Sequence, residues 1–138
     1  MPTRWETAAL ATRHRGRARL AVVELLAGQS CCLTAQEIFD RLRAVGSAVG
    51  LASVYRTLDQ LSAGGFVQKV ELGDGTTRYE PAEASGRHHH HVVCDSCGKV
   101  DAFEDERLEQ ALRRVEQRTG YAVAAHDVVL RGTCGDCG

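Results

Sequence analysis

The chain has 138 residues, enough for one domain of ordinary size or two small ones, and its 17 basic and 18 acidic residues nearly balance. No stretch approaches the roughly 20 apolar residues of a membrane span, and the N-terminus lacks the apolar segment of a signal peptide. We therefore expect a soluble, cytoplasmic protein that makes no contact with membranes. The arginines of the first 19 residues form a plausible electrostatic footprint for nucleic acid, although a solvated arm would look the same.

Two helices are predicted in the first 45 residues. The first covers about 18–27, where apolar residues recur at helical spacing and Gly28 follows. The second begins after Thr34, because Thr34 and Glu37 have the spacing of a capping box. The apolar residues expected to face the core from these two helices are Leu20, Val23, Leu26, Ala27, Ile38, Leu42 and Val45.

A third amphipathic helix is predicted at about 51–63, followed by a β-hairpin whose strands are 66–72 and 76–80. Three helices and a hairpin form a winged helix-turn-helix, in which the third helix enters the major groove of DNA and Arg56 can reach a base edge or a phosphate. The pattern alone also allows a small helical bundle with an additional hairpin. In the third helix the expected buried residues are Leu51, Val54, Leu58 and Leu61, and the opposite face carries Ser53, Arg56 and Gln60, with Tyr55 at its flank.

The fold class is therefore expected to be α+β, with a winged-helix DNA-binding domain at 1–80, a hinge at 81–87 and a small metal-binding α/β dimerisation domain at 88–138. This second domain is predicted to contain a histidine-rich strand, a strand near 99–103, a helix at about 105–119 and a last strand at about 121–131. About 50 residues with one helix bury little surface, so such a unit usually needs a metal and a partner subunit. The helix residues expected to be buried are Leu108, Ala111, Leu112 and Val115.

Four of the six cysteines form two C-x-x-C pairs. Each pair offers two thiolates at a separation that suits one metal ion, and two pairs complete the tetrahedral shell of a structural Zn²⁺ site. In a reducing cytoplasm metal ligation is favoured over disulfides. A redox dithiol or a set of unrelated thiols is the alternative. The four cysteines are Cys94, Cys97, Cys134 and Cys137.

Four consecutive histidines precede the first of these pairs. In a strand, successive side chains leave opposite faces, so His88 and His90 point one way while His89 and His91 point the other. One strand can therefore serve two metal sites, unless the histidines are simply a solvent-exposed basic run. Spacing alone does not choose the remaining ligands, for which the candidates are Cys32, Glu80, Glu83, Asp101, Glu104, Glu109 and His126, the last expected to face inward by strand parity.

These features together resemble the ferric uptake regulator family. The resemblance rests on the segment from Gly50 to Leu58 (G-L-A-S-V-Y-R-T-L), on the histidine strand with its C-x-x-C pair, and on the second C-x-x-C pair, and it covers nearly the whole chain. Members are dimeric, metal-responsive bacterial transcriptional repressors. The resemblance therefore implies a homodimer that binds palindromic double-stranded DNA operators.

The resemblance also implies three metal sites and a DNA-contacting surface. The structural zinc site matches the four cysteines, and the histidines divide between the other two sites as strand parity indicates. The regulatory metal site corresponds to Cys32, Glu80, His89 and His91, and the third metal site to His88, His90, Glu109 and His126. For DNA binding, the family's recognition-helix tyrosine and arginine correspond to Tyr55 and Arg56, and its basic N-terminal contact falls near His14 or Arg15. Ser53 lies on the same helix face as Arg56 and is included with them.

Two positions depart from the iron and peroxide sensors of the family. Cys32 stands where those sensors usually carry a histidine, and Ala102 where they carry a carboxylate. One thiolate, two imidazoles and one carboxylate suit tetrahedral Zn²⁺ better than Fe²⁺. We therefore predict a Zn-dependent regulator of zinc uptake genes, with Fe²⁺ or Mn²⁺ as the alternative regulatory ions. Glu83 competes with Glu80 for the acidic ligand position, Cys32 could instead be a small buried residue, and Cys31 is expected to be a core or surface residue.

Other functions are less well supported. An Fe²⁺-responsive or peroxide-sensing repressor would keep the same fold. A metalloenzyme needs an open metal position and a general base, and no nucleophile motif appears, so the chain is not expected to be an enzyme. A zinc storage protein would have no use for a recognition helix.

Overall fold

The computed structural model describes residues 16–29, 31–82 and 89–138. The chain divides into two compact units, residues 1–87 and 88–138. Within the described residues, no helix has both the length and the apolar character needed to cross a bilayer. His14, Arg15, Glu83 and His88, to which the sequence assigns candidate roles, lie outside the described part of the chain, as does most of the predicted hinge.

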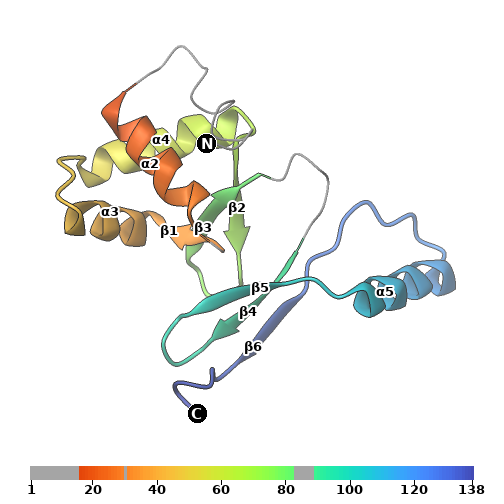
Figure 1. The fold of residues 1–138 in the computed structure, drawn as a ribbon. Helices are drawn as coiled ribbons and strands as arrows, with labels where there is room; N and C mark the ends of the chain where they lie inside the picture. Colours follow the sequence, from red (N-terminus) through yellow and green to blue (C-terminus); the bar gives the residue numbers. More distant parts are fainter. Residues whose placement is uncertain (1–15, 30, 83–88) are drawn as a thin grey trace. The chain divides into compact units, whose positions relative to one another are not determined.

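The N-terminal unit contains three described helices, α2 (Arg17–Ala27), α3 (Ala35–Ala44) and α4 (Leu51–Ala63), which pack against one another (Figure 1). All three lie where the sequence predicts them. Their inward faces form one hydrophobic core that also includes residues of the sheet. The helix residues with no exposed surface are Val22, Val23, Leu26, Ile38, Val54, Leu58 and Leu61.

Two residues predicted to face this core are exposed. The buried face of α2 is formed by Arg19, Val22, Val23 and Leu26, so Leu20 lies on the solvent side. Val45 is 81% exposed because α3 ends at Ala44 and the chain turns away from the helix at this C-cap position. Both predictions were wrong, for Leu20 because a short apolar stripe fits two neighbouring helix faces about equally well, and for Val45 because the helix ends before it.

The capping box predicted at the start of α3 is present. The Thr34 hydroxyl accepts a hydrogen bond from the Glu37 backbone N–H at 3.0 Å, and the Glu37 carboxylate accepts one from the Thr34 N–H at 3.4 Å. Replacing Thr34 with alanine should lower the free energy of unfolding by about 1 kcal/mol, because the Glu37 backbone N–H loses its side-chain acceptor. Urea denaturation measures this loss, and Thr34→Ser, which keeps the hydroxyl, should recover most of it; equal losses would rule out capping as the cause.

A three-stranded antiparallel sheet completes the winged helix. It consists of β1 (Leu33–Thr34), β2 (Val67–Glu71) and β3 (Thr77–Pro81) in the order β1-β3-β2. The hairpin of β2 and β3 matches the prediction, except that β2 is one residue shorter at each end and β3 is shifted by one residue. Strand β1 was not predicted, because two residues are too few to show an alternating pattern. Its pairing with β3 places Leu33 opposite Tyr79, so the segment before β1 lies beside the end of β3.

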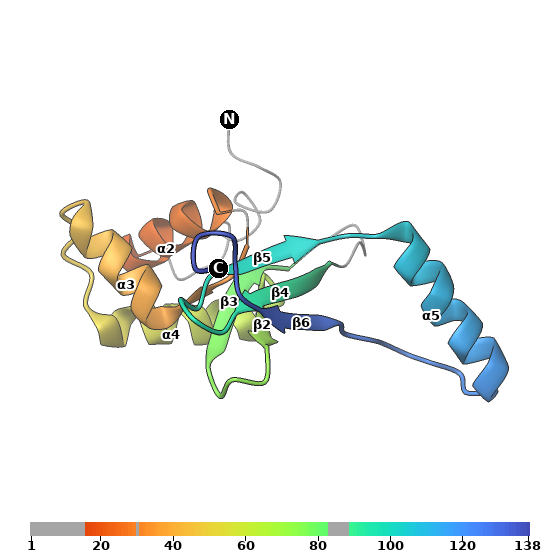
Figure 2. The same cartoon turned by 90° about the horizontal axis from the view of Figure 1, so that it is seen from below.

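The C-terminal unit has a second three-stranded sheet and one helix (Figure 2). Strands β4 (His90–Cys94), β5 (Val100–Phe103) and β6 (Val129–Gly132) lie in the order β5-β4-β6, with β4 antiparallel to β5 and parallel to β6. Helix α5 (Glu106–Thr119) begins at the N-cap Asp105 and ends at Gly120, whose φ of 75° favours glycine. The last strand was predicted to begin at Tyr121, but pairing begins only where β6 meets β4, at His91 and Val129.

The predicted buried stripe of α5 is not buried within the single chain. No residue of this helix is buried, and α5 lies beyond the end of the sheet instead of against its face (Figures 1 and 2). Large apolar side chains of the unit are correspondingly exposed, and Tyr121 is 75% exposed. Sequence periodicity shows which helix face is apolar but not what covers it, and among the described residues none of the predicted stripe is buried. The exposed large apolar residues of the described C-terminal unit are Val115, Tyr121, Val123 and Leu130.

Candidate metal centres and nucleic-acid interface

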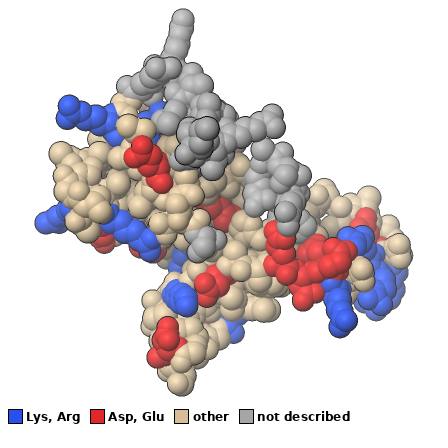
Figure 3. Space-filling model, viewed as in Figure 1, with Lys and Arg blue, Asp and Glu red and all other residues tan. Residues whose placement is uncertain are grey.

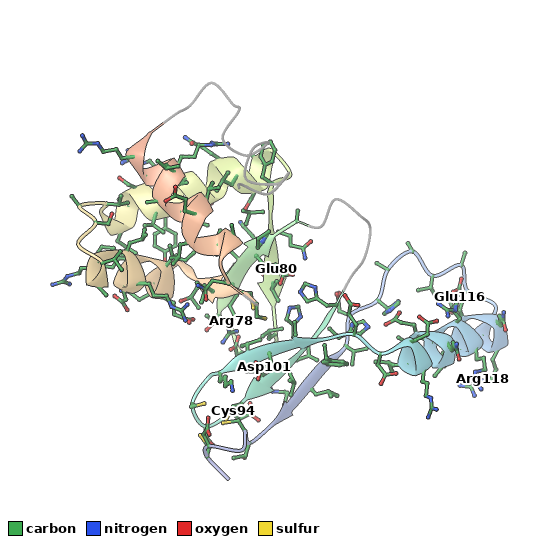
Figure 4. The ribbon with its side chains drawn as sticks, in the orientation of Figure 1. Arg78, Glu80, Cys94, Asp101, Glu116 and Arg118 are labelled. Carbon is green, nitrogen blue, oxygen red and sulfur yellow. The ribbon has the colours of Figure 1, made fainter. Side chains whose placement is uncertain are left out.

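The four cysteines of the two C-x-x-C pairs converge in the C-terminal unit. Their sulfur atoms all lie within 4.8 Å of one another, and the Sγ atoms of Cys97 and Cys134 are 3.8 Å apart (Figure 4). The parallel pairing of β4 with β6 brings the pairs together, since Cys94 lies opposite Gly132, two residues before Cys134. Two thiolates bound to one tetrahedral Zn²⁺ at about 2.3 Å lie roughly 3.8 Å apart, so the sulfur spacing fits this ion.

The electrostatics of this cluster also fit a bound cation. The backbone N–H of Cys134 donates to the Cys94 sulfur at 3.3 Å, and this bond, with others from the backbone, lowers the pKa of Cys94 to about 6. Hydrogen bonds with the neighbouring cysteines raise the pKa of Cys137 to about 12. Four thiolates this close repel one another, so all four can ionise together only around a positive charge.

A second cluster of the same unit contains His90, Glu109 and His126. The Glu109 carboxylate lies between the two imidazoles, with its oxygens 2.6 Å from His90 Nε2 and 2.9 Å from His126 Nε2. The backbone N–H of Val128 donates to His90 Nδ1 at 3.3 Å, which fixes the ring. The structure therefore brings together three residues of the predicted third site from β4, α5 and the segment before β6. Imidazole and carboxylate ligands suit Zn²⁺ and also harder divalent ions.

Glu109 should stabilise the C-terminal unit even without metal, because it joins α5 to the sheet. Its side chain is 18% exposed and His90 is buried, so Glu109→Gln leaves one imidazole without its acceptor. The free energy of unfolding should fall by about 1–3 kcal/mol. Thermal unfolding of protein that keeps its structural zinc but carries no metal at this cluster measures the change. Glu106→Gln on the same helix breaks only an exposed pair with Arg113 and should cost less than about 1 kcal/mol; equal effects would contradict the role of Glu109.

In the N-terminal unit, Cys32 and Glu80 of the predicted regulatory set lie close together. The antiparallel register of β1 and β3 continues to this pair, and the ligand atoms of Cys31, Cys32 and Glu80 lie within 4.8 Å of one another. Gln68 donates to the Glu80 carboxylate at 2.5 Å (Figure 4). Hydrogen bonding with Cys31, burial and the nearby negative charge of Glu80 raise the pKa of Cys32. The proximity of Cys31 to this pair was missed, because Cys31 was expected to be a core or surface residue.

The other two predicted regulatory ligands, His89 and His91, belong to the C-terminal unit. Their ring centroids are 4.9 Å apart in an edge-to-face arrangement. His90, between them, instead contacts Glu109 and sits 5.3 Å from the ring of His126. The three described histidines of the strand therefore alternate as strand parity predicts.

Helix α4 presents the residues predicted to contact DNA. Tyr55 and Arg56 are exposed, Ser53 is half-buried, and the Arg56 guanidinium donates to the Ser53 hydroxyl at 3.3 Å. Arg56 is the single basic residue of this fully described helix. In the C-terminal unit, acidic side chains gather at the junction of β5 and α5, where Glu104, Asp105 and Glu106 follow one another (Figure 3). Of the two units, the N-terminal one is therefore better suited to a polyanion.

Comparisons with known proteins agree with this arrangement. The sequence model of the ferric uptake regulator family matches residues 13–131. The ferric uptake regulation protein of Vibrio anguillarum is 35% identical over 120 residues, which are 86% of this chain and 78% of that protein. The crystal structure of the Vibrio cholerae ferric uptake regulator is 30% identical, with a TM-score of 0.79 over 93% of this chain and 98% of the other.

A further solved structure bears on the metal sites. The ferric uptake regulator of Helicobacter pylori is 28% identical, with a TM-score of 0.76 over 90% of this chain and 81% of that one, and is described as having three functional metal-binding sites. The sequence match, the shared two-part fold and the clusters of metal-ligating side chains all lead to one assignment. This chain belongs to the ferric uptake regulator family of metal-responsive transcriptional regulators, which are not enzymes.

Proposed function

We propose that this chain is a zinc-responsive repressor of zinc uptake genes that binds palindromic operators as a homodimer. Cys32, Glu80, His89 and His91 would hold the regulatory Zn²⁺, and the four cysteines a structural Zn²⁺. The observation that carries the choice of zinc is the thiol of Cys32 beside the Glu80 carboxylate. Burial disfavours the negative charges of the thiolate and the carboxylate, and a bound dication would offset this cost.

The ligand chemistry supports zinc over iron. A thiolate is a soft ligand, and a set of one sulfur, two nitrogens and one oxygen matches the four-coordinate preference of Zn²⁺. Fe²⁺ and Mn²⁺ favour more ligands and harder ones, and Ala102 offers no side-chain ligand where iron sensors have a carboxylate. The third metal site would consist of the cluster of His90, Glu109 and His126 together with His88. It would tune the response to zinc by holding α5 in place.

The exposed apolar face of the C-terminal unit supports a dimer. Val115, Tyr121, Val123 and Leu130 are its large apolar side chains that are exposed among the described residues. Exposed apolar surface of this kind marks a protein interface, and a unit of this size needs one to be stable. A dimer would present two α4 helices to the two halves of a palindrome.

Metal-dependent DNA binding tests the proposal. The probe is a labelled duplex selected by the zinc-loaded protein from a random palindromic library, and fluorescence anisotropy gives its affinity. Zinc should raise the affinity about 5- to 150-fold over chelator, the usual range of allosteric coupling. The Cys32→Ala variant should bind the probe weakly with or without zinc, while keeping its structural zinc. Equal affinities of the wild-type chain in zinc and in chelator would contradict the proposal, and failure to select any duplex would favour a storage role.

An iron or peroxide sensor is the second candidate, because the relatives compared above are named for ferric uptake. Loading the chain with Fe²⁺ in the same binding measurement separates the two. If iron is the effector, Fe²⁺ should raise DNA affinity at concentrations where Zn²⁺ does not. If the chain senses peroxide, mass spectrometry of the iron-loaded, peroxide-treated protein should find an added oxygen atom on His89 or His91.

A further inference from the structure

The thiol groups of two adjacent cysteines of the N-terminal unit, Cys31 and Cys32, lie side by side. In extended chain, neighbouring side chains leave opposite faces. Here the backbone bends at Cys31, just before β1, and the Sγ atoms of Cys31 and Cys32 are 3.5 Å apart. None of the six cysteines, all of which are described, forms a disulfide. The bend therefore sets two thiols side by side without joining them covalently.

The geometry of this pair is that of two ligands on one ion. Sulfurs bound to one tetrahedral Zn²⁺ lie roughly 3.8 Å apart, and the Cys97 and Cys134 sulfurs show this spacing in the structural centre. The 3.5 Å between Cys31 and Cys32 is close to it and far from the roughly 2 Å of a disulfide. The Glu80 carboxylate lies within 4.8 Å of both sulfurs. Two thiols and one carboxylate thus converge within a single unit.

We propose that Cys31 is a second thiolate ligand of the sensory metal, so that Cys31, Cys32 and Glu80 supply three of its four ligands. The inference rests on the proposed regulatory site and deepens it by naming the ligands that set metal choice. With two thiolates, one tetrahedral position remains for an imidazole. Cys31 would therefore replace one of the two histidines in the ligand set proposed above. Each additional sulfur favours Zn²⁺ over Fe²⁺ and Mn²⁺, because soft ligands bind these harder ions poorly.

Cobalt spectroscopy of the full-length chain counts the thiolates. The structural centre keeps its zinc, confirmed by metal analysis, while the sensory ion is removed by chelator and replaced by Co²⁺. Charge transfer from sulfur to Co²⁺ absorbs in the near ultraviolet, in proportion to the number of bound thiolates. Cys31→Ser and Cys32→Ser should each remove about half of this absorbance, and the double variant all of it. Glu71→Gln, an exposed change on β2 of the same unit that belongs to no proposed metal site, should leave the absorbance unchanged.

The outcomes separate this inference from the proposed function. If Cys31→Ser absorbs like the wild type while Cys32→Ser loses the whole band, Cys31 is not a ligand, although zinc regulation can still hold. If DNA binding does not respond to zinc but both single variants halve the band, the two-thiolate site stands and its proposed regulatory role fails. If a variant does not fold, cadmium NMR of the unmodified chain provides the test instead. A resonance of the sensory site typical of two sulfur ligands would support the proposal, and one typical of a single sulfur ligand would overturn it.

Discussion

Replacing Cys94 and Cys97 together with serine is expected to remove one zinc ion per subunit and to unfold the C-terminal unit. The described residues of this unit bury few side chains, and its buried apolar residues are Val93 and Cys94. Metal binding must therefore supply much of its stability. Structural zinc sites contribute about 10–16 kcal/mol of apparent binding free energy, as much as the whole stability of an ordinary domain.

Metal analysis and calorimetry measure both effects. The variant should lose the unfolding transition of the C-terminal unit and behave as a monomer in sedimentation, while the helices of the N-terminal unit, which has its own core, remain visible by circular dichroism. Ser96→Ala, an exposed change within the same C-x-x-C pair, is the matched control and should keep the zinc. A double serine variant that still holds its zinc and still dimerises would contradict the structural role.

Replacing Arg56 with alanine is expected to abolish specific DNA binding at zinc saturation. Arg56 is exposed on α4 and is the single basic residue of that helix. An arginine on a base edge contributes about 1–3 kcal/mol of discrimination. A dimer uses the residue twice, so the loss should be roughly 2–6 kcal/mol, at least about 30-fold in affinity.

Fluorescence anisotropy with the selected duplex measures this loss of affinity. The salt dependence of binding then shows whether Arg56 contacts a base or a phosphate. If Arg56 reads a base, Arg56→Ala should relax preference at one position of each half-site; if it binds phosphate, all sequences weaken together and the salt slope falls. Arg118→Ala, at the end of α5 in the other unit (Figure 4), is the matched control. Wild-type affinity for Arg56→Ala would rule out a role of Arg56 in DNA recognition.

Local features were the most predictable from sequence. The capping box at Thr34, the glycine at the end of α5 and the extent of α4 follow from rules that involve only a few neighbouring residues. The alternation of His89, His90 and His91 follows in the same way from the pleat of a strand. The predictions failed at Leu20, Val45 and residues 121–128. At these positions the buried helix face, the helix end or the strand pairing depends on contacts with other elements, which the local sequence does not show.

By itself, the sequence determined which residue types could bind metal and how they are spaced within each segment: the two C-x-x-C pairs, the alternating histidines and the cysteine before the second helix. Tertiary structure alone decided which of them meet. The parallel register of β4 and β6 joins the two cysteine pairs, α5 brings Glu109 to His90, and the bend before β1 turns Cys31 toward Cys32. The reason is physical: backbone periodicity repeats over a few residues, whereas strand register and chain bends are set by packing across the whole unit.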